Sequence, residues 1–286
     1  MDFGISVPNN QGIASVRDLV QVAVDAERLG FASVWVSEHL FHASYVAARL
    51  GDRPYHEALV VLTAIATVTE RVRLGTSVLV LPWHHPARLA KQVASLDELA
   101  GGRVVLGVGV AQTPDEFANL GVPYATRGVV TDDAIDALRA LWEQDVPAHQ
   151  GTHYRFAGLR FSPKPLQARL PILIGGNSPR ALRRVREKGD GWHAMSLSVN
   201  EVRESIAGAA GKPCSIRLVL EFTATPGTRA IAERRALKGT PGEIVEQLRG
   251  YAAVGVGEVV VDANLGDAAA VADCYRRFRE EVMPAL

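Results

Sequence analysis

Eight short runs of apolar, mostly β-branched residues alternate along the chain with longer segments in which apolar residues recur at helical spacing. The runs are Phe3–Val7, Ser33–Val36, Val72–Leu79, Arg103–Gly109, Pro171–Gly175, Gly191–Met195, Ser215–Phe222 and Glu258–Asp262. When a helix follows each strand, right-handed connections make parallel pairing the natural outcome. Eight such units in 286 residues predict an α/β protein with a (β/α)8 TIM barrel as a single domain, residues 1–286. An open doubly wound sheet is the alternative, but no GxGxxG follows the first run.

Local capping signals mark the ends of several predicted helices. Thr240–Glu243 has the capping-box pattern with proline at the first helical position. Ser178-Pro179 and His85-Pro86 also place a proline where its missing N–H costs little. Glycines at 30, 101, 102 and 189 follow helical segments, as glycine often does at a helix C-terminus.

One long segment, from about Glu143 to Leu170, has neither the apolar run of a strand nor the helical spacing of apolar residues. A loop of this length inside a compact fold usually has a function. We therefore predict a loop insertion before the fifth strand, with a small hairpin as one form that it could take.

Charge and composition limit the classes of function. Thirty-one basic residues balance thirty-one acidic ones, which gives no general field for nucleic acid or an anionic membrane. No segment reaches the roughly 18 apolar residues of a membrane helix, and the first residues enter a strand-like run without a basic leader pattern. The two cysteines, Cys214 and Cys274, have no metal-ligand spacing. We expect a cytoplasmic protein with reduced thiols.

Barrel enzymes carry their chemistry at the C-terminal ends of the strands. That rule selects residues after the second, third, fourth and fifth predicted strands. The candidate site residues are Glu38, His39, Thr76, Ser77, Val78, Gly109, Ala111, Gln112, Gly175, Gly176, Asn177 and Ser178.

The turn Gly175-Gly176-Asn177-Ser178 has the most specific chemistry of this set. Two glycines let backbone N–H groups approach a ligand closely, and Ser178 stands where a helix N-terminus attracts an anion. The alternative interpretation is a tight turn with an ordinary serine cap. The position of the turn at the phosphate-binding end of a barrel favours the anion site.

His39 is the candidate for proton transfer, because imidazole exchanges a proton near neutral pH. A histidine that only caps a loop is the alternative. His84 and His85 lack the spacing of a metal pair, so we expect no metal site. The arginines at 180, 183, 184 and 186 are interpreted as a solvated helix face.

Nine stretches together resemble the bacterial luciferase-like monooxygenase superfamily, and within it the oxidoreductases that depend on the deazaflavin coenzyme F420. They occur in family order and spacing over most of residues 1–195. The stretches are AERLGF at 26–31, VWVSEH at 34–39, LGTSV at 74–78, HPARLAK at 85–91, GGR at 101–103, LGVG at 106–109, EF at 116–117, PILIGGNS at 171–178 and GDGW at 189–192.

The resemblance implies a luciferase-like barrel that holds F420, or FMN as the alternative, in its mouth. It implies a phosphate at Gly176–Ser178, the redox face of the ring near a cis peptide bond at Ser77-Val78, and His39 beside the ring. Relatives that oxidise sugar phosphates keep a carboxylic acid where this chain has Ala111-Gln112. Because Gln112 cannot protonate a substrate, this departure weakens a sugar-phosphate dehydrogenase interpretation. The region from 200 to 239 has no motif that matches.

These features favour a hydride-transfer oxidoreductase that acts on a small-molecule substrate, with His39 or a water handling the proton. An FMN-dependent monooxygenase that uses reduced flavin and O2 and a non-catalytic flavin-binding barrel stay as alternatives. A metal-dependent hydrolase is disfavoured by the lack of ligand clusters. Relatives are commonly dimers, so a homodimer is the oligomeric state to test; no nucleic-acid or membrane partner is expected.

Overall fold

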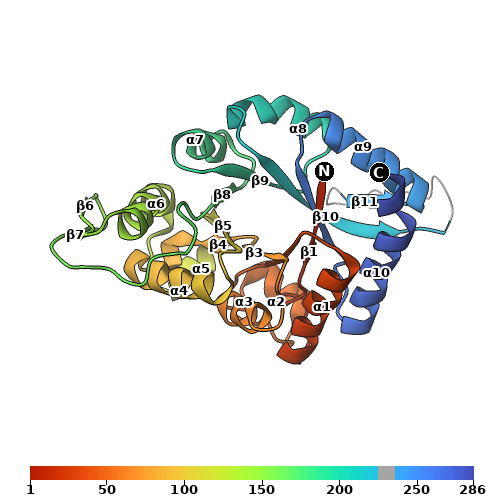
Figure 1. Cartoon of the computed structure of the whole chain (residues 1–286), viewed down its shortest axis with the longest axis horizontal. Helices are drawn as coiled ribbons and strands as arrows, with labels where there is room; N and C mark the ends of the chain where they lie inside the picture. Colours follow the sequence, from red (N-terminus) through yellow and green to blue (C-terminus); the bar gives the residue numbers. More distant parts are fainter. Residues whose placement is uncertain (225–235) are drawn as a thin grey trace.

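Eight parallel strands close into a barrel in the computed structural model, which describes residues 1–224 and 236–286 (Figure 1). Each strand pairs with the next in the order β1-β2-β3-β5-β8-β9-β10-β12, and β12 pairs with β1. The barrel strands are β1 (Asp2–Ser6), β2 (Ser33–Val36), β3 (Arg73–Thr76), β5 (Val104–Gly109), β8 (Ile172–Gly175), β9 (Gly191–Met195), β10 (Cys214–Phe222) and β12 (Glu258–Asp262). The predicted barrel is confirmed, and all eight runs become barrel strands.

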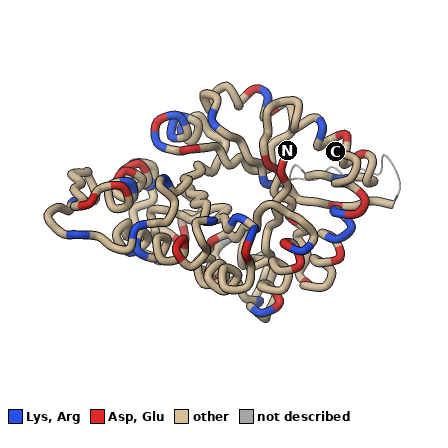
Figure 2. Tube along the Cα trace, viewed as in Figure 1, with Lys and Arg blue, Asp and Glu red and all other residues tan. Residues whose placement is uncertain are grey.

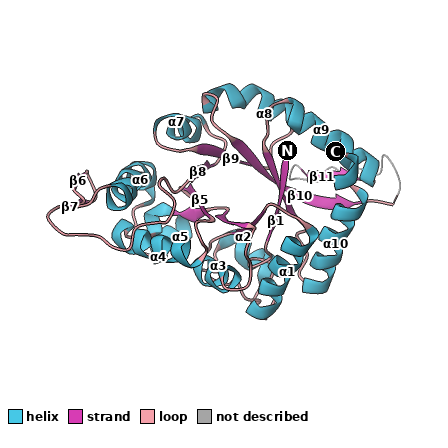
Figure 3. Ribbon diagram, in the orientation of Figure 1, coloured by secondary structure: helices cyan, strands magenta, loops and turns pink. Residues whose placement is uncertain are grey.

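Helices surround the barrel on its outer side (Figure 3). They are α1 (Val16–Leu29), α2 (Ser44–Leu50), α3 (Ala58–Ala66), α4 (Pro86–Leu99), α5 (Pro114–Asn119), α6 (Arg127–Glu143), α7 (Pro179–Glu187), α8 (Val199–Ser205), α9 (Pro241–Ala253) and α10 (Ala268–Glu281). Alternate strand residues point to opposite faces. Ile5, Val34 and Leu74 therefore join the large core beneath the helices, whereas Trp35, Val105 and Val260 form a small cluster inside the barrel.

The third predicted strand, Val72–Leu79, is interrupted in the structure. β3 ends at Thr76, the Ser77-Val78 peptide bond is cis as the resemblance implied, and the chain resumes as β4 (Leu79–Val80) beside β5. A further strand that the sequence did not predict, β11 (Ala236–Gly239), pairs in parallel with the outer part of β10. The unmatched region 200–239 includes residues 225–235, which lie outside the described residues.

The loop insertion before the fifth barrel strand contains the small antiparallel hairpin β6 (His149–Gln150) and β7 (Arg155–Phe156). It extends from one side of the barrel in Figure 1. Asp133 of α6 holds the base of this insertion: its carboxylate accepts hydrogen bonds from His149 Nε2 at 2.5 Å and from the backbone N–H of His153 at 2.6 Å. Burial opposes ionisation of Asp133, but these bonds outweigh it and lower the pKa of its carboxyl.

The predicted caps are present at four helices, including α4, where His85 accepts from the N–H of Ala87 ahead of Pro86. Thr240 and Glu243 form a reciprocal capping box, Ser178 accepts from the N–H of Ala181, and Gly30 ends α1 in the left-handed conformation. At α7 the cap residue is Lys188, one position before the expected Gly189.

The expected solvated arginine face on α7 is wrong for Arg184. This side chain is buried, donates through Nε to Asp132 of α6 at 2.5 Å, and so joins two helices. Elsewhere Lys and Arg are interspersed with Asp and Glu over the whole tube (Figure 2). No helix within residues 1–224 and 236–286 has the length and apolar character needed to cross a bilayer.

Candidate functional site

A cavity of about 660 Å³ opens at the C-terminal ends of the barrel strands. Pockets of about 300–1,000 Å³ hold cofactors and small molecules. All candidate residues except Thr76 line this cavity. Thr76 is buried, and its hydroxyl donates to the carbonyl oxygen of Gly107 at 2.7 Å. A second cavity of about 490 Å³ lies at the opposite end of the barrel, around Asp2, Arg73 and Glu258.

The side chain of Val78 fills space that two glycines leave open in the cavity wall. A Cβ atom at Gly109 or at Gly175 would lie 2.7 Å from a methyl carbon of Val78, closer than side chains pack. These glycines are therefore required by the protein's own packing around the Ser77-Val78 bond.

The turn Gly175–Ser178 joins β8 to α7 and is fixed by three contacts. Gly176 has φ +107°, a conformation that L side chains rarely adopt, and its carbonyl accepts from Trp192 Nε1 at 2.8 Å. The Asn177 amide donates to the carbonyl of Met195 at 2.7 Å and accepts from the N–H of Met195 at 3.1 Å. A Cβ at Gly176 would meet only Ala181 among protein atoms, at 3.5 Å, so within the protein the cost of a side chain there is backbone strain.

The N-terminus of α7 has the free donors that an anion needs. Ser178 Oγ accepts from the N–H of Ala181 at 3.2 Å, and Pro179 has no N–H. Within the described residues, no protein acceptor takes the backbone N–H of Asn177, Ser178 or Arg180. Such amides at a helix start attract negative charge.

His39 is held by a carboxylate that the sequence did not select. Its Nδ1 lies 2.6 Å from Oε2 of Glu116, which is fully buried at the start of α5. The same carboxylate accepts from Thr113 Oγ1 at 2.8 Å and from the N–H of Leu40 at 3.0 Å. Burial alone would raise the pKa of Glu116, but the bonds from His39 and Thr113 outweigh it and lower the pKa.

This arrangement gives the two ring nitrogens of His39 different roles. Nδ1–H donates to the Glu116 carboxylate, so in the neutral ring Nε2 is the basic nitrogen. The ring also contacts Tyr55 and Trp83 edge-on, at centroid separations of 5.6 and 6.2 Å. The geometry suits a histidine that exchanges protons through Nε2.

Glu38, a candidate cofactor-binding residue, has both carboxylate oxygens bonded to protein. Oε2 accepts from the N–H of Val80 at 2.7 Å, and Oε1 lies 2.8 Å from His84 Nε2. Burial opposes the charge on His84, but Glu38 outweighs it and raises the pKa of His84. His85 instead caps α4, so the two histidines diverge. Among residues 1–224 and 236–286, no three His, Cys, Asp or Glu side chains form a group that could hold a metal ion.

Beneath the cavity, the buried side chain of His193 links two serines of the barrel interior. Nε2 lies 2.8 Å from Ser77 Oγ, Nδ1 lies 2.7 Å from Ser215 Oγ, and the ring stacks on Trp35 with centroids 4.8 Å apart. Burial and the charge of Arg217 lower the pKa of His193 to about 3. His193 is therefore a neutral structural residue at physiological pH.

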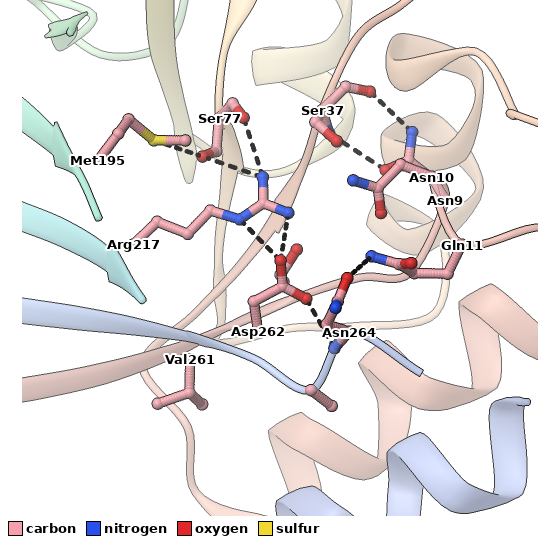
Figure 4. A network of polar contacts seen from close by, with 12 residues as sticks. Asn9, Asn10, Gln11, Ser37, Ser77, Met195, Arg217, Val261, Asp262 and Asn264 are labelled. Carbon is pink, nitrogen blue, oxygen red and sulfur yellow. Dashed lines mark hydrogen bonds and ion pairs between the residues drawn. The ribbon is translucent and has the colours of Figure 1, made fainter. Parts of the chain in front are cut away.

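Arg217 of β10 and Asp262 of β12 form a buried ion pair in the cavity wall (Figure 4). Arg217 Nη2 donates to Asp262 Oδ2 at 2.7 Å, and Nη1 donates to the carbonyl oxygen of Ser77 at 3.1 Å. Burial opposes the charge on Arg217, but Asp262 outweighs it and raises the pKa. Sequence reasoning missed both residues. Asp262 ends a predicted strand, so the strand-end rule would have found it there, and Arg217 interrupts an apolar strand.

Residues 1–212 of the chain match the luciferase-like monooxygenase family. The chain belongs to that family. It is 31% identical over 260 residues to the uncharacterized protein Rv0953c of Mycobacterium tuberculosis, covering 86% of this chain and 88% of the relative. It is also 26% identical over 325 residues to the F420-dependent glucose-6-phosphate dehydrogenase of Intrasporangium calvum, covering 94% and 95%.

Several solved structures share the fold over nearly the whole chain. Monooxygenase RslO1 from Streptomyces bottropensis has a TM-score of 0.82 at 22% identity and 99% coverage of both chains. The F420-dependent tetrahydromethanopterin reductase of Methanopyrus kandleri has a TM-score of 0.80 at 15% identity, covering 99% and 98%. The oxygenating constituent of 3,6-diketocamphane monooxygenase from Pseudomonas putida, in complex with FMN, has a TM-score of 0.77 at 16% identity, covering 99% and 98%. Two of these proteins are thus named for dependence on F420, and one structure contains FMN.

Proposed function

We propose that this protein is an F420-dependent oxidoreductase that transfers a hydride between the deazaflavin and a small organic substrate. The observation that carries the proposal is the His39–Glu116 pair at the wall of a cavity that also contains an anion-binding turn. Relatedness to an F420-dependent dehydrogenase over 94% of the chain supports the choice of cofactor.

The residues present fit a phosphorylated deazaflavin. The cavity of about 660 Å³ is large enough for a tricyclic ring. The unpaired amides at the start of α7, with the Ser178 hydroxyl, suit its phosphate. Ser77, Val78, Gly109, Ala111 and Gln112 line the cavity and would hold the ring there.

A bound deazaflavin supplies the hydride acceptor or donor. The chain's own part is to position the reactants and to move the one proton that accompanies the hydride. When an alcohol is oxidised, one hydrogen leaves carbon as hydride and the hydroxyl proton must leave oxygen. His39 Nε2 accepts that proton, and the negative charge of Glu116 stabilises the imidazolium that forms. In the reverse direction the same nitrogen returns the proton.

Gln112 argues against a sugar-phosphate substrate, because no carboxylic acid occupies that position. The substrate is proposed to be another small organic molecule. We also propose that the protein acts as a homodimer in the cytoplasm.

A fluorescence titration with F420, FMN and FAD, each oxidised and reduced, tests the proposal. F420 should bind more tightly than FMN. Equal or tighter binding of FMN, with O2 consumption when reduced FMN is added, would favour the monooxygenase. Tight binding of either cofactor with no turnover of alcohols, ketones or imines would favour a non-catalytic flavin-binding barrel.

A further inference from the structure

The second cavity, at the end of the barrel opposite the mouth, has walls built from the starts of the strands. Its volume of about 490 Å³ lies within the range of about 300–1,000 Å³ that holds small molecules. Val105 and Leu173, which belong to the apolar cluster inside the barrel, line it together with Pro171 and Pro213. The cavity therefore offers an apolar surface to a ligand.

Glu258, at the start of β12, brings a buried carboxylate to this wall. Its side chain is 9% exposed, and Oε1 accepts hydrogen bonds from Ser33 Oγ and from Arg73 Nη2, the second at 3.2 Å. Oε2 has no hydrogen-bond partner among residues 1–224 and 236–286, and it does not belong to the unpaired atoms that the protein closes off from solvent. A ligand in the cavity can therefore reach an unused acceptor.

The carboxylate is held in place by contacts that leave Oε2 free. Ser33 Oγ, which donates to Glu258, also accepts from Trp35 Nε1 at 2.7 Å. A Cβ atom at Gly4 would lie 2.1 Å from Ser33 Oγ, so the glycine makes room for this chain of bonds. An acceptor that is already fixed loses little entropy when a ligand binds it.

The charges around Glu258 favour a cation. Arg73 Nη2 donates to Asp2 Oδ2 at 3.1 Å as well as to Glu258, so two carboxylates share one guanidinium and leave one excess negative charge. The other two charged side chains of the wall are bonded elsewhere: Arg103 to backbone carbonyl oxygens and Asp190 to two arginines that do not line the cavity.

The environment of Glu258 leaves its negative charge incompletely compensated. Burial raises the pKa of its carboxyl, and the bonds from Arg73 and Ser33 offset only part of this effect. A further positive charge at Oε2 would stabilise the ionised form. Within the described residues no three His, Cys, Asp or Glu side chains form a group for a metal ion, so an organic cation fits better than a metal.

We propose that the second cavity binds a small primary amine, whose ammonium group donates to Glu258 Oε2 and whose apolar body lies on Val105 and Leu173. This site is separate from the mouth and does not depend on the proposed function. An ammonium group has three donors and no acceptor, which matches a carboxylate oxygen that lacks a partner. Because hydrogen bonds between charged partners are stronger than those between neutral ones, a neutral alcohol of the same shape binds more weakly.

Benzylamine and benzyl alcohol are the probes, because they share an aromatic body and differ in the charge of the head group. Ligand-detected NMR on the cofactor-free protein gives both dissociation constants. Benzylamine should bind with a Kd of about 1 mM or lower, and at least about 10-fold more tightly than benzyl alcohol. In Glu258→Gln this ratio should fall to about 1, because the amide oxygen can keep the bonds from Ser33 and Arg73 while the amide nitrogen replaces Oε2.

Two further measurements locate the bound amine. Asp2→Asn removes an exposed carboxylate that bonds the same arginine, and it should weaken benzylamine binding by less than about 3-fold. The indole N–H signal of Trp35, which is linked to Glu258 through Ser33, should shift in the protein's NMR spectrum when benzylamine binds. The signal of Trp83, which contacts His39, should not shift.

Five results would overturn the proposal. They are no saturable binding of benzylamine, which would leave water as the occupant; equal affinity for benzyl alcohol; undiminished binding of benzylamine by Glu258→Gln; an equal loss in Asp2→Asn; and a shift of the Trp83 signal in place of that of Trp35, which would put the amine at the mouth. If Glu258→Gln does not fold, the two probes and the Trp35 signal of the wild type still decide. A failure of F420 to bind would refute the proposed function and leave this test intact.

Discussion

Replacing Glu116 with glutamine removes one negative charge from a fully buried position and leaves the shape of the side chain nearly unchanged. Oε2 of Glu116 accepts from His39 Nδ1 at 2.6 Å and from Thr113 Oγ1 at 2.8 Å, and an amide nitrogen at that position cannot accept. Hydrogen bonds to charged groups contribute about 1.5–3 kcal/mol each. Because the new amide can donate to the Thr113 hydroxyl, we expect Glu116→Gln to lower the free energy of unfolding by about 2–4 kcal/mol at pH 7.

The pH dependence of that loss has a defined sign. The pKa of Glu116 is lowered in the folded protein, so its contribution to stability is present above the ordinary value of 4.5 and is lost as the pH falls through the lowered value. The difference between wild type and variant should therefore be constant from pH 7 down to about 5 and shrink below 4.5.

Urea unfolding of both proteins from pH 3.5 to 7 measures this difference. Glu98→Gln is the matched control, because Glu98 is exposed and the same change there should shift stability by less than about 0.5 kcal/mol. A Glu116→Gln effect as small as that of the control, or one that does not diminish at low pH, would refute the assignment of Glu116 as the ionised support of His39.

Three further outcomes follow from the site. His39→Ala should lower kcat by about 10²–10⁴-fold with little change in the Kd of F420, as paired kinetics and titrations would show; a collapse of affinity with turnover intact would make His39 a binding residue only. Asp262→Asn should lower the free energy of unfolding by about 3–5 kcal/mol, because it leaves the charge of Arg217 buried and unpaired. Denaturant unfolding measures this loss, and the control Glu246→Gln, which changes an exposed ion pair, should show a far smaller one. Ser178→Ala should cost about 1 kcal/mol of stability and weaken F420 binding by about 10-fold if the hydroxyl contacts the phosphate; unchanged affinity would move the phosphate elsewhere.

The sequence was sufficient for the barrel because its signals are local and repeated. Each barrel strand is a short apolar run, and the capping boxes and prolines mark helix starts by chemistry within four residues. The interruption between β3 and β4 could not be located from periodicity, because apolar residues stand on both sides of it, Leu74 before and Val78-Leu79 after. β11 escaped prediction because its sequence, ALKG, contains no β-branched residue, and it pairs with the C-terminal end of β10.

The site residues at strand ends that carry motifs were predicted from the sequence. The residues that reach the site only through long-range contacts were missed. His39 was selected from the end of β2, but its partner Glu116 lies 77 residues away, and only the fold brings the two together. Arg217 and Asp262 are separated by 45 residues in the chain and meet because β10 and β12 are neighbours. The glycines of the turn after β8 were interpreted as room for a ligand, and the structure shows that Gly175 makes room for Val78.

The structure of crystals soaked with oxidised F420 tests the central claim most directly. The account predicts that the ring occupies the cavity at the barrel mouth, with Ser77, Val78 and His39 around it, and that the phosphate lies on the backbone amides of Asn177 and Ser178. Cofactor density confined to the cavity at the opposite end of the barrel, or a phosphate bound away from the start of α7, would contradict the account.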